Sequence, residues 1–228
     1  MTTVSKTKQD VLAEIKLLYD SKATKGRIVD AISNLKLIVT TTGDSVPQGY
    51  GSLEELETSL IAEYNQVRDL ITRYRDLKTA LQCSNVANQS SVSDYVSIMI
   101  GSTRYKLVTA MEIRHCSIYL DEMLLTRMAS AYHGNKRSVA NMEEVYKRNK
   151  ETYLAGLTTR NKQSEEAPMD ATFMEQLGQQ YDKLNKPKLI DPLKLESKMK
   201  ELQEWIDLVK TQVDSAISVH NCTTYIEV

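Results

Sequence analysis

Apolar residues recur every three or four positions over long stretches of the chain, which is the spacing of one face of an α-helix. This pattern predicts a helix over residues 8–38 and a second from residue 52 to about residue 81. The second helix starts with Ser52 and Glu55, which have the spacing of a capping box. Its apolar positions form a coiled-coil seam. With the polar loop 40–51 between them, the two helices are expected to form an antiparallel hairpin.

A third helix is predicted from Leu107 to about Tyr132, and Gly134 has the position of a helix C-cap. Apolar residues lie on two sides of this helix, so we expect it to pack between partner helices. One of its two apolar stripes also contains Arg114 and Asp121.

The last helix has the most regular apolar seam. Asp191 and Pro192 are residue types favoured at the N-cap and the first helical position. From Leu195 to Ala216 the apolar residues follow in unbroken steps of four and three. This seam and the third helix present more apolar surface than one short hairpin covers. We therefore predict a homo-oligomer.

A charged stretch between the third and the last helix is expected to form a helical arm. Residues 136–186 have a weak apolar pattern, with helices predicted at 139–156 and 170–184. The predicted organisation is one compact domain plus this arm. Its segments are residues 1–135, an inserted arm at 136–190, and a C-terminal helix and strand at 191–228 that pack back on the first segment.

Two short segments have the composition of β-strands. Residues 95–100 and 103–106 contain several β-branched and aromatic residues around Gly101 and Ser102, which predicts a β-hairpin. We expect it to be the only sheet. Residues 223–228 predict a short C-terminal strand. The predicted fold class is mostly α, with long antiparallel helical hairpins in a coiled-coil-like bundle, a small β-hairpin and a short C-terminal strand.

Composition agrees with a helical protein and excludes several functions. Gly (8) and Pro (4) are too scarce for a turn-dense sandwich or barrel. Lys+Arg is 29 and Asp+Glu is 30, a balance that argues against nucleic acid as a partner. No window approaches twenty apolar residues and the first ten residues are polar, so neither a membrane partner nor a signal peptide is expected.

The reactive side chains do not form a known catalytic pattern. Cys83, Cys116 and Cys222 are widely spaced, which fits a reducing, cytoplasmic compartment and argues against a zinc site. His115 adjoins Cys116, but neighbouring side chains on a helix point about 100° apart and cannot pair as nucleophile and base. Phosphate-loop, dinucleotide, zinc-protease and nucleophile-elbow motifs are absent from the sequence. We therefore expect no enzyme activity, no metal and no cofactor.

Arg114 and Asp121 are the charged pair that the sequence singles out. Seven residues apart on a helix, they would lie on one face two turns apart. One interpretation is a structural ion-pair network, in which Arg114 pairs with Asp121 or with an acidic residue of another helix. A second is an anion site, with the Arg114 guanidinium as a planar fork. A third is plain surface exposure.

Three short segments are similar to motifs of one known family. Residues 81–85 are similar to the motif Ile-Asn-x-Thr-Asn. Asn85 matches its last residue, and Ser84 has a hydroxyl where the motif has Thr. Residues 107–114 match the Leu, Ala and Arg of Leu-Thr-x-Ala-Leu-x-x-Arg. Residues 221–226 are similar to Asn-Trp-Thr-Thr-x-Leu/Ile.

Together with the hairpin over residues 8–81, these segments agree in order and spacing with the septicolysin-like family across about three quarters of the chain, which resembles this family. Cys222 stands where the family motif has Trp. The arm has no counterpart in this pattern. The resemblance implies a homo-oligomeric helical assembly, such as a ring, and supplies no reaction.

The predicted ligand site lies where the hairpin, the third helix and the C-terminal strand would meet. Its amide, hydroxyl and guanidinium groups suit a small anionic or nucleotide-like ligand, and it has no base for catalysis. The predicted function is a non-enzymatic cytoplasmic protein that sequesters such a ligand, for example as a viral anti-defence sponge. The alternative is a structural coiled-coil scaffold or assembly protein, in which the same residues are caps and turns. The site residues are Asn85, Arg114, Asn221, Thr223, Thr224 and Tyr225.

Overall fold

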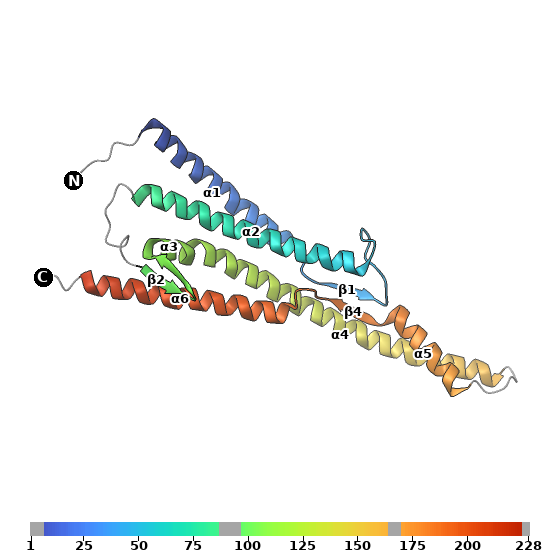
Figure 1. Cartoon of the computed structure of the whole chain (residues 1–228). Helices are drawn as coiled ribbons and strands as arrows, with labels where there is room; N and C mark the ends of the chain where they lie inside the picture. Colours follow the sequence, from blue (N-terminus) through green and yellow to red (C-terminus); the bar gives the residue numbers. More distant parts are fainter. Residues whose placement is uncertain (1–6, 87–96, 164–169, 225–228) are drawn as a thin grey trace. The chain divides into compact units, whose positions relative to one another are not determined.

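Helices dominate the computed structural model, which describes residues 7–86, 97–163 and 170–224, and the mostly-α fold class is confirmed (Figure 1). A π-helical turn at Ile113–Ser117 joins α3 to α4. The elements in chain order are α1 (Lys8–Asn34), β1 (Val39–Thr42), α2 (Leu53–Val86), β2 (Ser97–Ile100), β3 (Thr103–Lys106), α3 (Leu107–Glu112), α4 (Ile118–Gln163), α5 (Ala171–Asn185), β4 (Pro187–Ile190) and α6 (Leu195–Thr224).

The chain forms two compact units, and the helices α2 and α4 contribute residues to both. Unit 1 contains α1, the β2–β3 hairpin, α3 and nearly all of α6. Unit 2 contains β1, β4 and α5, with the first turns of α2 and the longer part of α4. The residue ranges are Met1–Leu35, Glu63–Met128 and Glu196–Val228 for unit 1, and Lys36–Ala62 and Ala129–Leu195 for unit 2.

The core of unit 1 is made by the apolar seams that the sequence predicts. Core residues on the apolar faces of α2, α4 and α6 are at most 2% exposed, so these helices bury the central part of their apolar faces within the chain. The α6 seam therefore no longer argues for an oligomer. These core residues include Val67, Ile71, Leu120, Leu124, Val209 and Val213.

The third predicted helix does not end at Gly134. Helix α4 continues through this glycine to Gln163. A glycine inside a helix costs about 1 kcal/mol relative to alanine, which the many other helical residues offset. The start of this helical stretch is irregular instead, because the π-helical turn holds one extra residue and changes which side chains face the core.

Unit 2 contains a sheet that the sequence analysis missed. Strands β1 and β4 pair antiparallel, with Val39 opposite Ile190 (Figure 1). The expectation of a single sheet is wrong, and the first residues of the expected loop 40–51 are a strand. Val39 and Ile190 pack against Leu56 and Leu60 of α2 in one apolar cluster.

Gly43 follows β1 and allows a close approach of two backbones. Its φ is +58°, in the left-handed region. Its N–H donates to the carbonyl oxygen of Lys186 at 2.8 Å. A Cβ at this position would lie 2.3 Å from the carbonyl oxygen of Leu184. Only glycine fits here without displacement of the end of α5.

The β2–β3 hairpin is confirmed, with Gly101 in the left-handed region at its turn. Residues 95 and 96 of the predicted first strand lie outside the described residues. The predicted C-terminal strand starts with Thr223 and Thr224, which are the last residues of helix α6, and its remainder also lies outside the described part.

Helix α6 starts at Leu195, later than the sequence predicts. The Asp191 carboxylate accepts the Leu195 N–H at 3.0 Å, so this aspartate caps the helix from four residues away. Pro192 lies in a turn before the helix, and Lys194 has a φ of 50°. None of the described helices is both long and apolar enough to cross a membrane.

Candidate functional site

Arg114 is held by a carboxylate from another helix. Its Nε lies 3.2 Å and its second terminal nitrogen 3.4 Å from the two oxygens of Asp214 on α6. This contact agrees with the interpretation in which Arg114 forms a structural ion pair with an acidic residue of another helix. The guanidinium is partly exposed at 28% and Asp214 at 56%, so the pair is accessible to water.

The other predicted site residues are not brought to Arg114 by any described contact. Asn221 lies on α6 two turns beyond Asp214 and is exposed. Asn85 is in the last turn of α2, and Thr223 is at the end of α6 beside Thr224; the side chains of these three residues are outside the described part. Tyr225 lies wholly outside it.

Asp121 takes part in a polar cluster that joins three helices of unit 1. Its carboxylate is 1% exposed and accepts hydrogen bonds from Arg68 of α2 and from the Trp205 side chain of α6. Asp121 and Arg114 therefore have different partners. The π-helical turn is the physical reason, because it puts Asp121 on the packed face and leaves Arg114 at the edge.

The burial of Asp121 has an electrostatic cost. Burial raises the pKa of this carboxyl above its ordinary value, more than the Arg68 guanidinium and the Trp205 hydrogen bond lower it. A buried carboxylate needs such partners, so Asp121 fixes the positions of the guanidinium and the indole. Both groups are thereby pre-organised before any ligand arrives.

A cleft of about 290 Å³ opens beside this cluster. Arg68 is 34% exposed and extends from the buried carboxylate into the cleft. One of its terminal nitrogens bonds Asp121, and a guanidinium has five N–H donors in all. The lining combines two cations, one carboxylate and two aromatic rings, from Tyr64, Arg68, Lys198, Glu201, Leu202 and Trp205.

Sequence reasoning found only one member of this site. Asp121 is conspicuous because it interrupts an apolar stripe, and a buried acid requires a partner. Arg68 and Trp205 carry no such signal, since arginine on a helix is ordinary and a single tryptophan is usual in a core. Only the packing of α2 and α6 on α4 brings them to the carboxylate.

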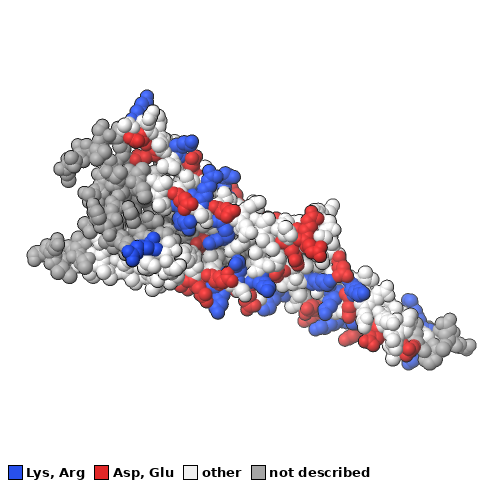
Figure 2. Space-filling view, viewed as in Figure 1, with Lys and Arg blue, Asp and Glu red and all other residues white. Residues whose placement is uncertain are grey.

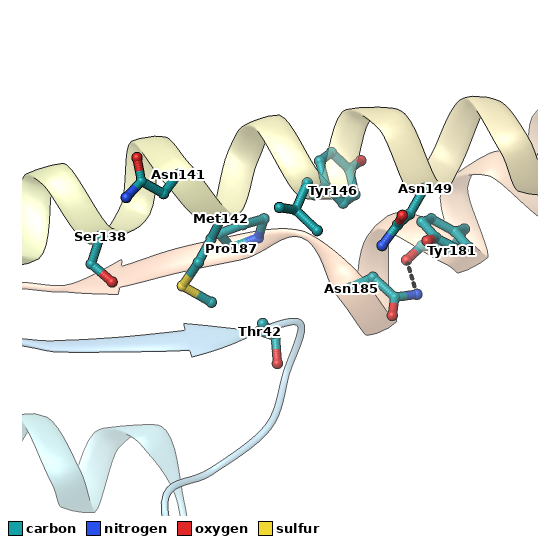
Figure 3. A pocket seen from close by; sticks show the side chains of 10 residues that line it. Thr42, Ser138, Asn141, Met142, Tyr146, Asn149, Tyr181, Asn185 and Pro187 are labelled. Carbon is teal, nitrogen blue, oxygen red and sulfur yellow. Dashed lines mark hydrogen bonds between the residues drawn. The ribbon is translucent and has the colours of Figure 1, made fainter.

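A second concavity, an open groove of about 380 Å³, lies in unit 2 (Figure 3). Residues of α4 form one side, while residues of α5 and the ends of β1 and β4 form the other. All of its lining side chains are uncharged. They are Thr42, Ser138, Asn141, Met142, Val145, Tyr146, Asn149, Tyr181, Asn185 and Pro187.

Stacked tyrosines fix one end of this groove. The Tyr181 ring stacks on Tyr153 of α4 at 4.9 Å between centroids, and its centroid is 6.2 Å from that of Tyr146. The Tyr146 hydroxyl donates to Asp182, which also accepts from Lys150 at 2.8 Å. The hydrogen bonds of Lys150 and Tyr146 lower the pKa of Asp182 below its ordinary value. These contacts hold α5 against α4.

The described residues hold no group of three His, Cys, Asp or Glu side chains placed to bind a metal ion. Charges of both signs are interspersed on the face in Figure 2, without a large area of one sign. Comparison with protein-family models, with curated proteins and with solved structures found no match.

Proposed function

We propose that the protein is a non-enzymatic binding protein that sequesters a small anionic, nucleotide-like ligand in the cleft beside Arg68. The observation that carries the proposal is the buried Asp121 carboxylate, which holds the Arg68 guanidinium and the Trp205 indole at one cleft. Pre-organised groups lose little conformational entropy on binding, which favours affinity.

The lining of the cleft favours an anion that carries a ring. Arg68 and Lys198 supply two cations against the single carboxylate of Glu201, whose Oε2 lies 3.1 Å from the Lys198 ammonium. A guanidinium binds phosphate or carboxylate through two parallel hydrogen bonds. The Tyr64 and Trp205 rings give apolar aromatic surface of the kind on which bases stack. A volume of about 290 Å³ suits one such group rather than a polymer.

Binding without turnover fits the side chains of the cleft. Its lining includes neither a histidine nor a cysteine, and it has no nucleophile that is paired with a base. The role that follows is the removal of a ligand from the cytoplasm. A viral anti-defence sponge for a nucleotide signal is the form of this role that we propose.

A structural scaffold is the second candidate, and specific contacts favour it. The Arg114–Asp214 and Lys210–Glu122 pairs join α6 to the preceding helical stretch within unit 1. In a scaffold, the Arg68–Asp121 pair would be one more such connection, and the cleft would have no ligand.

Isothermal titration with nucleoside mono-, di- and triphosphates and cyclic dinucleotides separates the two functions. The double variant Arg68→Met, Asp121→Leu removes the guanidinium together with the carboxylate that needs it, so the fold should persist. We expect the wild type to bind at least one of these compounds. The double variant should lose about 2–3 kcal/mol, or roughly 30- to 150-fold in affinity.

The matched control is Arg114→Met, which removes a guanidinium on an exposed ion pair and should leave the affinity unchanged. Arg68→Lys should not restore binding, because an ammonium cannot form the planar fork. Equal binding by the wild type and the double variant would contradict the site. No binding of any tested compound by the wild type would contradict the ligand class and favour the scaffold.

A further inference from the structure

The groove between α4 and α5 differs from the Arg68 cleft in its chemistry. No charged side chain lines it, whereas the cleft has three. A charged ligand would lose hydration in this groove without gaining an ionic partner. Its volume of about 380 Å³ is in the range of small-molecule sites. The groove therefore fits a small uncharged ligand.

Three carboxamides supply the hydrogen-bonding groups of the groove. The side chains of Asn141 and Asn149 make no hydrogen bond to another described residue. Asn185 uses its nitrogen on the carbonyl oxygen of Tyr181 at 3.0 Å, as Figure 3 shows, and this bond leaves its side-chain oxygen as an acceptor. An amide offers donors and an acceptor in one plane, which matches the edge of a nucleobase.

The aromatic side of the groove is held rigid. Tyr146 and Tyr181 line it, and the stacking of Tyr181 on Tyr153 and the hydrogen bond from Tyr146 to Asp182 fix both rings. Contact between a base and an aromatic side chain contributes about 1–3 kcal/mol. Met142 and Val145 add apolar surface on the same side of α4.

We propose that this groove binds an uncharged nucleobase, presented as a free nucleoside. The carboxamides of Asn141 and Asn149 bond the edge of the base, and the tyrosine rings with Met142 contact its face. This site is independent of the proposed function, because the phosphate that favours the Arg68 cleft is a disadvantage here.

The test is isothermal titration of the full chain with adenosine, guanosine, cytidine and uridine. The double variant Asn141→Ala, Asn149→Ala changes two exposed helical positions to the best helix former, so its melting temperature should stay the same or rise. We expect at least one nucleoside to bind the wild type, and at least tenfold weaker binding to the variant.

The matched control is Thr158→Ala, Thr159→Ala, which changes two exposed positions of α4 outside the groove and should bind like the wild type. Equal affinity of the asparagine variant and the wild type would overturn the site. Failure of all four nucleosides to bind the wild type would overturn the ligand class. Loss of nucleoside binding in the Arg68→Met, Asp121→Leu chain, with binding intact in the asparagine variant, would place the ligand in the other cavity.

Discussion

Asp121 shows how one side chain can organise its surroundings. Its carboxyl group is almost fully buried and accepts hydrogen bonds from Arg68 and Trp205. The sequence marks Asp121 as unusual, because an acid interrupts an apolar stripe. The sequence alone does not predict the partners of Asp121, because they come from helices that are distant in sequence.

The raised pKa of Asp121 gives a pH dependence of defined sign. As pH rises above its ordinary value of 3.8, the folded chain keeps a proton on this carboxyl that the unfolded chain has lost. The contribution of this carboxyl to the free energy of unfolding therefore falls through this range in the wild type and is absent in Asp121→Asn. Urea unfolding at a series of pH values measures this effect. The free energy of unfolding of Asp121→Asn, relative to that of the wild type, should increase as pH rises.

Asp182→Asn is the control of opposite sign. The pKa of Asp182 is lowered, so its contribution to stability is present above the ordinary value and is lost as pH falls. The free energy of unfolding of Asp182→Asn, relative to that of the wild type, should decrease as pH rises. The same direction in both variants would contradict the roles assigned to the two carboxyls.

Gly43 gives a prediction about backbone strain. Gly43→Ala combines a left-handed φ of +58° with a Cβ 2.3 Å from a backbone oxygen. We expect a loss of about 3 kcal/mol or more in the free energy of unfolding. Gly134→Ala, in a helix with open space around it, should instead gain up to about 1 kcal/mol. Similar denaturation midpoints for the two variants would refute this account of the β1–α5 connection.

At the scale of elements, the ion pairs between helices differ in how much they contribute to the free energy of unfolding. Arg68→Met leaves a buried carboxylate without its cation, and because Arg68 is one-third exposed we expect a cost of about 2–3 kcal/mol. Addition of Asp121→Leu should recover most of this loss. Arg114→Met breaks a water-accessible pair and should cost about 0–1 kcal/mol. Chemical denaturation of the set measures these values, and an equal cost for both arginines would contradict the ranking.

Apolar periodicity was enough to predict the helical seams. Val209 and Val213 of α6 lie on the predicted seam and are fully buried. The same reasoning failed where the helix period changes, because a π-helical turn leaves no mark in the apolar spacing. It also failed at β1, since four residues form a strand here only by pairing with β4, almost 150 positions later.

At the scale of the whole molecule, the predicted homo-oligomer now depends on different residues. The α6 seam is covered within the chain, whereas the first half of α1 exposes Leu12 at 55% and Leu18 at 54%. We expect sedimentation equilibrium to show a self-associating species and the variant Leu12→Glu, Leu18→Glu to be monomeric. A stable wild-type monomer at micromolar concentration would contradict the prediction.

The proposed binding site follows from the packing of three helices in unit 1 rather than from a local motif. Arg114 was singled out by its place on a stripe and by a family resemblance, but the structure gives it a carboxylate partner. The cleft beside Arg68 exists because α2, α4 and α6 each supply one member of the Asp121 cluster. Such a three-helix arrangement is not encoded in any single segment.

Tryptophan fluorescence tests the proposed function most directly, because Trp205 is the only tryptophan of the chain and lines the cleft. Titration of the wild type with the nucleotide panel should give a saturable change in emission, and the Arg68→Met, Asp121→Leu variant should show no change over the same range. A wild-type emission spectrum that stays constant at saturating nucleotide, with binding detected by calorimetry, would contradict the placement of the ligand beside Arg68.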